Sequence, residues 1–161
     1  SRELAIQIEQ VMREMGTGFK VNAVYGGRSG SKDRVDIKHR PSVLIGTPGR
    51  VSDHLRRQAF LTDSVKTLVL DEFDKSLEIG FEKEMRDIIK LLPQVHKKVL
   101  TSATQSLRIP EFVGLKEPLT NISTPKYGYD CTCSSRTPLY FIDRHFFFLD
   151  FPKHVVFIFA Y

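Results

Sequence analysis

Short apolar runs alternate with amphipathic segments from residue 2 to about residue 104 of this 161-residue chain. Apolar residues three or four positions apart are typical of helices with one buried face, and runs of four to eight apolar residues suit buried strands. Strands that alternate with helices predict an α/β fold with a mostly parallel sheet covered by helices. The connections from strand ends to helices gather along one edge of such a sheet, so we expect functional residues there.

We expect helices at residues 2–15, 31–40, from Thr47-Pro48 onward and at 77–92, and strands at residues 19–25, 43–45, 65–70, 97–101 and 119–123. The first helix should bury a stripe made of Leu4, Ile8, Val11 and Met15. Thr47 at a cap position, followed by Pro48 at the first helical position, predicts a helix start. Val51 and Leu55 should then lie on the buried side of that helix.

An acidic turn, Asp71-Glu72-Phe73-Asp74, directly follows the apolar run that ends at Leu70. Three carboxylates in four positions repel one another, so clustering them at a strand end requires a cation or hydrogen-bond donors. Magnesium bound to a nucleotide would meet this need. A solvated acidic turn is the alternative, and these four residues alone leave it open.

Positive charge is concentrated between Arg28 and Arg57, where eight Lys and Arg stand against three Asp, a surplus equal to the +5 of the whole chain. Such a segment attracts polyanions through counterion release, although many basic segments are only solvated surface. The charge does not distinguish RNA from DNA.

No run approaches the eighteen or so apolar residues of a membrane span, and the first residues lack the apolar stretch of a signal peptide. We therefore expect no membrane association and a cytoplasmic location. Cys131 and Cys133 are too close together to staple a fold, and without further ligands they are weak evidence for a metal site.

Five strings occur in a fixed order along the chain: SRELAIQI, GG, TPGR, DEFD and SAT. In this order, each at a strand-helix junction, they resemble the first RecA-like domain of DEAD-box ATP-dependent RNA helicases. The resemblance covers residues 1 to about 125. It implies a RecA-like fold of the P-loop NTPase type, with ATP, Mg²⁺ and RNA as ligands and a second RecA-like domain as partner.

The resemblance also implies roles for the acidic turn. Asp71 matches the position that holds Mg²⁺, usually through water, beside the β- and γ-phosphates of ATP. Glu72 matches the acid that orients and activates the attacking water, so both residues belong to the nucleotide site. Asp74 matches a relay position that hydrogen-bonds Ser102 and Thr104 and couples the nucleotide site to RNA.

The residues that match RNA-contacting positions of the family are Arg2, Gly27, Thr47, Gly49 and Arg50. Backbone N–H groups at a helix start, a hydroxyl and a guanidinium bind phosphate without reading bases, so binding should be independent of sequence. Pro48 is expected only to start its helix. His39 and His54 match no catalytic position, and we expect both on the surface.

The chain departs from the family pattern in three ways, the third of which is its tail after Pro125. Phe73 stands where the family has the alanine of its name, and we expect its ring to pack beneath the site. No Gly-x-x-x-x-Gly-Lys-Thr loop and no second domain occur in these residues, so the chain alone should not turn over ATP. Without the phosphate-loop strand, we expect a fold that is incomplete near the sheet centre, with unpaired strand edges and poor solubility.

The character of the chain changes after Pro125. Residues 126–161 hold both cysteines, most of the aromatic residues and no glutamate, and they match nothing in the helicase family. We expect either an out-of-frame or chimeric extension or a short added hairpin. The function is then that of a fragment of an ATP-dependent RNA helicase; a non-catalytic nucleic-acid-binding module and a DNA-directed helicase of the same superfamily are the alternatives.

Overall fold

The structure is a computed structural model that describes residues 2–16, 18–102, 109–114 and 155–159. Its elements are, in chain order, α1 (Arg2–Glu14), β1 (Val21–Val24), α2 (Gly30–Lys38), β2 (Val43–Gly46), α3 (Pro48–Arg56), β3 (Thr67–Asp71), α4 (Phe73–Glu78), α5 (Glu82–Leu91), β4 (Lys97–Leu100), the 3-10 turn η1 (Glu111–Val113) and β5 (Val155–Phe159). Helices and strands therefore alternate as the apolar pattern predicts.

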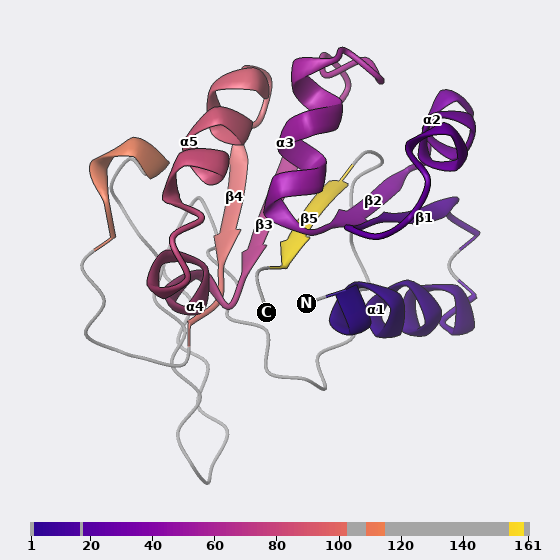
Figure 1. Cartoon of the computed structure of the whole chain (residues 1–161), viewed down its shortest axis with the longest axis horizontal. Helices are drawn as coiled ribbons and strands as arrows, with labels where there is room; N and C mark the ends of the chain where they lie inside the picture. The colour runs from indigo at the N-terminus through magenta and orange to yellow at the C-terminus, as the bar shows by residue number, and fades with distance from the viewer. Residues whose placement is uncertain (1, 17, 103–108, 115–154, 160–161) are drawn as a thin grey trace, which may run out of the picture.

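The strands form one sheet in the order β1-β2-β5-β3-β4, and every neighbouring pair is parallel. Helix α1 covers one face, whereas α2, α3 and α5 lie on the other (Figure 1). Successive strand residues point to opposite faces. Val43 and Ile45 accordingly pack in the cluster that contains α1, and Leu44 packs in the cluster under α3 and α5. The predicted α/β fold with a covered parallel sheet is confirmed.

Strand β5, from the aromatic-rich end of the chain, occupies the middle of this sheet. Its residues pair with β2 from Val43↔Val155 to Gly46↔Ile158 and with β3 from Thr67↔Val155 to Asp71↔Phe159. The facing edges of β2 and β3 are thus both paired, so the expected central gap with unpaired edges is wrong. Strand β5 is parallel to both neighbours, so Val155–Phe159 is not paired as in an antiparallel hairpin. The rest of residues 126–161 lies outside the described residues, and the added hairpin and the out-of-frame or chimeric extension both stay predictions.

The single helix expected over residues 77–92 is two helices, α4 and α5. Gly80 lies between them with φ +93°, a conformation that glycine adopts readily and that ends a helix. In α1 the expected stripe is wrong at Val11, which is 53% exposed; the buried residues are Ala5 and Met12.

The start of α3 follows the prediction. Thr47 is the N-cap and Pro48 the first helical residue, although the Thr47 hydroxyl makes no capping hydrogen bond. Val51 and Leu55 are buried, as expected. The strand expected at residues 119–123 lies outside the described residues.

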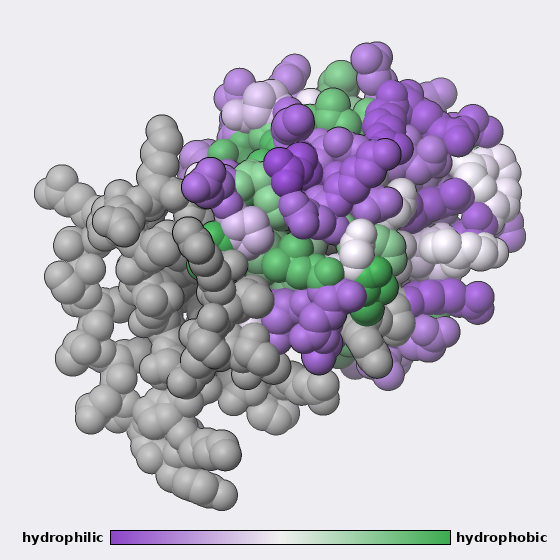
Figure 2. All heavy atoms as spheres, turned by 60° about the vertical axis from the view of Figure 1, so that its left-hand side comes forward, coloured by the Kyte–Doolittle hydropathy of each residue, from purple (hydrophilic) through white to green (hydrophobic). Residues whose placement is uncertain are grey.

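Helices α3 and α5 pack side by side and are joined at the surface by an ion pair between Arg56 and Asp87. The hydrogen bond from Arg56, together with its charge, lowers the pKa of Asp87 below the ordinary value of 3.8. Hydrophilic residues cover most of the described surface in Figure 2, and hydrophobic residues gather in a patch near the middle of that view. No helix in the described ranges is long and apolar enough to cross a membrane.

Candidate functional site

The acidic turn lies at the carboxyl end of β3, beside the end of β4. Asp71 is the last residue of β3, and Thr101 directly follows β4. The Thr101 hydroxyl donates to Asp71 Oδ1 and accepts from the Glu72 N–H at 2.9 Å, and the Phe73 N–H donates to the Thr101 carbonyl at 2.9 Å. Thr101 therefore orients the Asp71 carboxylate and fastens the acidic turn to the neighbouring strand.

Glu72 has a left-handed backbone, with φ 48° and ψ 49°. For a residue other than glycine this conformation costs on the order of 1 kcal/mol and persists only where its surroundings hold it. The Glu72 N–H donates to the Thr101 hydroxyl, and the Glu72 carbonyl accepts from the Ser76 N–H at 3.0 Å. Both backbone polar groups of Glu72 are therefore held. Backbone strain that the surrounding structure maintains in this way is frequent at functional sites.

Phe73 and Asp74, which follow in the same turn, are both buried. Phe73 is 1% exposed and belongs to the core cluster beneath α3 and α5, so its predicted packing role is confirmed. Asp74 is also 1% exposed, and Ser102 follows Thr101 past the end of the neighbouring strand. Thr104 lies outside the described residues, and the relay between these residues stays a prediction.

The turn suits a cation that is held partly by other ligands. Among the described residues, no group of three or more His, Cys, Asp or Glu could hold a metal ion. Thr101 donates to Asp71 Oδ1, and Asp71 Oδ2 accepts no hydrogen bond in the described part of the chain. Magnesium prefers carboxylate oxygen and commonly keeps several waters, so this one oxygen fits the predicted water-mediated contact.

A second group of predicted residues meets at the glycine turn after β1. The Arg2 guanidinium lies over the Tyr25 ring, with its carbon 5.9 Å from the ring centroid. Gly27 has φ +82°, and a Cβ placed there would lie 3.3 Å from Arg2 Nη1. Arg2 and Gly27, which are far apart in sequence, are thus neighbours, and the positive φ explains why a glycine stands at this turn.

Arg50, from the start of α3, reaches the same turn. Its Nε donates to Asp33 Oδ2 at 2.8 Å and its Nη2 donates to the Arg28 carbonyl at 3.0 Å. A Cβ on Gly30 would lie 3.2 Å from Nη2, so the guanidinium sits directly against the turn. The structure thereby brings Arg2, Gly27 and Arg50 to one region, with Thr47 and Gly49 on the first turn of α3.

Asp33 and His54 are parts of this region that the sequence did not reveal. The Asp33 side chain is fully buried, and His54 Nε2 lies 3.0 Å from its Oδ2. The prediction of a surface His54 is wrong, whereas His39 is exposed as expected. Helical spacing could have indicated the burial of His54, because it shares a face with Val51 and Leu55.

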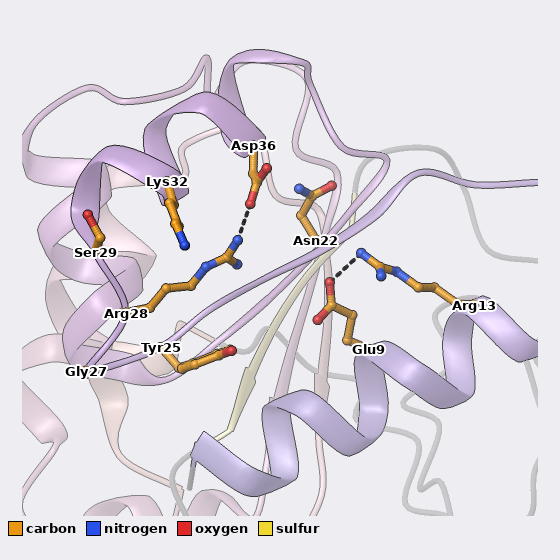
Figure 3. Close-up of a pocket in the computed structure, with 9 residues that line it drawn as sticks. All are labelled: Glu9, Arg13, Asn22, Tyr25, Gly27, Arg28, Ser29, Lys32 and Asp36. Carbon is orange, nitrogen blue, oxygen red and sulfur yellow. Dashed lines mark hydrogen bonds and ion pairs between the residues drawn. The ribbon is translucent and has the colours of Figure 1, made fainter.

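A cleft of about 650 Å³ adjoins the glycine turn (Figure 3). It lies between α1 and α2 over β1, the edge strand of the described sheet, and it is lined by Glu9, Arg13, Asn22, Tyr25, Gly27, Arg28, Ser29, Lys32 and Asp36. Arg13 donates to the Val21 carbonyl at 3.2 Å and Arg28 to the Ala23 carbonyl at 2.9 Å. These guanidiniums cap acceptors of the edge strand, which makes pairing with another strand less favourable.

Comparisons with known proteins agree with this geometry. The family model described as DEAD/DEAH box helicase matches residues 1–112. Among curated proteins, ATP-dependent RNA helicase DRS1 of Eremothecium gossypii is 39% identical over 125 residues, covering 74% of this chain and 17% of the relative. ATP-dependent RNA helicase eIF4A of Candida albicans is 34% identical over 155 residues, covering 83% of this chain and 39% of the relative.

Solved structures give the same result. A DEAD box protein from the hyperthermophile Methanococcus jannaschii superposes with a TM-score of 0.61 at 31% identity, covering 65% of this chain and 29% of that one. A hypothetical ATP-dependent RNA helicase from Sulfolobus tokodaii superposes with a TM-score of 0.62 at 28% identity, covering 71% and 34%. The chain therefore spans well under half the length of each of these relatives.

Proposed function

Because this chain belongs to the DEAD/DEAH box helicase family, we propose that it supplies one side of the nucleotide site and one RNA-contacting surface of an ATP-dependent RNA helicase. The observation that carries the proposal is the acidic turn at the end of β3, where the Thr101 hydroxyl holds Asp71 and the Glu72 backbone. The surface around Arg2, Gly27 and Arg50 is the second element of the proposal.

Phosphoryl transfer needs charge neutralisation and a positioned nucleophile more than it needs covalent chemistry from the protein. Mg²⁺, when bound with ATP, supplies the charge neutralisation. Asp71 would hold it through water by Oδ2, since Thr101 occupies Oδ1. Glu72 would orient the attacking water and accept its proton, and a second RecA-like domain would complete the cleft.

The RNA surface offers backbone N–H groups, a hydroxyl and guanidiniums, all of which suit phosphate. Lys32 and Arg34, on the neighbouring helix α2, have no ion-pair partner within the described ranges and add positive charge nearby. These contacts carry no base information, so binding should be independent of sequence. Competition between RNA and DNA of the same sequence tests the preference for RNA.

The decisive experiment is RNA-stimulated ATP hydrolysis by a protein in which this segment is joined to a phosphate loop and a second RecA-like domain, with and without Glu72→Gln. Loss of a positioned general base costs about 10²- to 10⁴-fold in rate, so we expect at least a hundredfold decrease with nucleotide binding retained. Glu78→Gln is the matched control, because Glu78 ends the same helix α4 and pairs only with exposed Lys75 in the described part of the chain. Full activity of Glu72→Gln would refute the assignment of Glu72.

A further inference from the structure

Asp33 is a buried carboxylate that joins the two predicted RNA-contacting segments. It lies in α2, just after the glycine turn, and its side chain is 0% exposed. A buried charge is costly unless it is paired and hydrogen-bonded. Here the hydrogen bond comes from Arg50, on α3, so the carboxylate connects α2 to the helix that starts at Thr47.

The Arg50 guanidinium is held at two points. Arg50 Nε donates to Asp33 Oδ2 at 2.8 Å, and Arg50 Nη2 donates to the Arg28 carbonyl at 3.0 Å. The side chain is only 21% exposed, and Nη1 makes no hydrogen bond in the described part of the chain. A planar guanidinium held through two of its nitrogens has one orientation, so the direction of the remaining Nη1 is set.

Other contacts hold Asp33 itself in place. His54 Nε2 lies 3.0 Å from Oδ2, and Arg28 Nε lies 3.4 Å from Oδ1 as an ion pair without a hydrogen bond. Asp36, also on α2, holds the other end of Arg28. The negative charges of Asp33 and Asp36 are thus matched by the positive charges of Arg28 and Arg50.

We infer that Asp33 is a positioning residue for phosphate binding: it orients Arg50, and through Arg50 the carbonyl of Arg28, so that the glycine turn and the start of α3 form one rigid RNA-contacting unit. The inference rests on the proposed function, because it supposes that this surface binds RNA. Asp33 itself touches no RNA, since its side chain is fully buried.

The test is binding of single-stranded RNA by the 161-residue chain, measured by fluorescence anisotropy. Asp33→Asn keeps the shape of the side chain and removes its charge, and we expect about tenfold weaker binding from loss of a charged hydrogen bond. Asp53→Asn is the matched control: it removes the same charge from an exposed ion pair with Arg57 on α3, and it should leave affinity unchanged. Equal affinity of Asp33→Asn and the unchanged chain would overturn the inference.

A double-mutant cycle with Arg50→Gln separates positioning from a general effect on folding. If Asp33 acts through Arg50, Asp33→Asn should weaken binding no further once Arg50 is Gln. Additive losses would overturn the inference. The Nε–H signal of Arg50 in the NMR spectrum, identified by its absence in Arg50→Gln, should lose its protection from solvent exchange in Asp33→Asn.

If Asp33→Asn does not fold, Arg50→Lys tests the same Arg50–Asp33 contact by changing its more exposed partner. A lysine keeps the charge but cannot reproduce the fork that joins two acceptors, so about tenfold weaker binding is again expected. Wild-type affinity in Arg50→Lys would overturn the inference while leaving the proposed function intact. Absence of RNA binding by the unchanged chain would overturn the proposed function, and the inference with it.

Discussion

Removal of β5 should abolish the cooperative fold of this chain. The strand pairs with β2 over the four residues Val155 to Ile158 and with β3 over the five residues Val155 to Phe159. At about 1 kcal/mol net for each paired residue, the backbone contribution alone is roughly 9 kcal/mol. That is as large as the whole stability of a typical domain, about 5–15 kcal/mol. A chain of residues 1–154 should therefore lack a sharp unfolding transition.

The assay is urea unfolding followed by far-ultraviolet circular dichroism, with the chain of residues 1–159 as the control because it keeps β5. The control should unfold in one transition, whereas the shorter chain should lose signal gradually and expose less surface on unfolding, which lowers the slope m. The reasoning would be refuted by equal midpoints and equal slopes for the two chains.

Three further predictions concern single side chains. Gly46→Ala should destabilise the chain by about 1–3 kcal/mol or more in thermal unfolding, because the added Cβ would lie 2.4 Å from the Val51 side chain. Gly49→Ala is the control: its Cβ meets nothing within 4 Å, so the unfolding midpoint should stay unchanged or rise. Thr101→Val should cost about 1–3 kcal/mol in urea unfolding, since it leaves a carboxylate and a backbone N–H without their partner; unchanged stability would contradict the hydrogen bonds described. Asp87→Asn should lower the urea midpoint at neutral pH. Arg56 lowers the pKa of Asp87, so the stabilisation is fully present above pH 3.8 and is lost as pH falls through the lowered pKa, and the two urea midpoints should converge in strong acid.

Local patterns predicted much of the fold because they act between residues close in sequence. Thr47 and Pro48 start α3, since a cap and a proline need only the next turn of helix to act. Val51 and Leu55 are buried because helical spacing alone places them on one face. Gly80 is the local signal that the prediction missed, and it divides the helix expected there into α4 and α5.

Long-range contacts decided what the patterns could not. Asp33 lies in a basic, polar stretch that is typical of solvated surface, and its burial depends on Arg50 and His54, 17 and 21 positions away. Thr101 precedes the SAT string without matching any motif, and its role depends on β4 lying next to β3. Neither residue carries a signal in its own neighbourhood.

The sequence by itself determined the alternation of helices and strands from α1 to β4, apart from the division between α4 and α5, together with the family and the acidic turn at the end of an apolar strand. Each of these is encoded in consecutive residues. The tertiary structure decided which strand occupies the centre of the sheet. Strand propensity in Val155–Phe159 indicates an extended backbone but names no partner, since backbone hydrogen bonds are the same for every strand. Only the tertiary structure, in which β5 pairs with β2 on one side and with β3 on the other, selects that place.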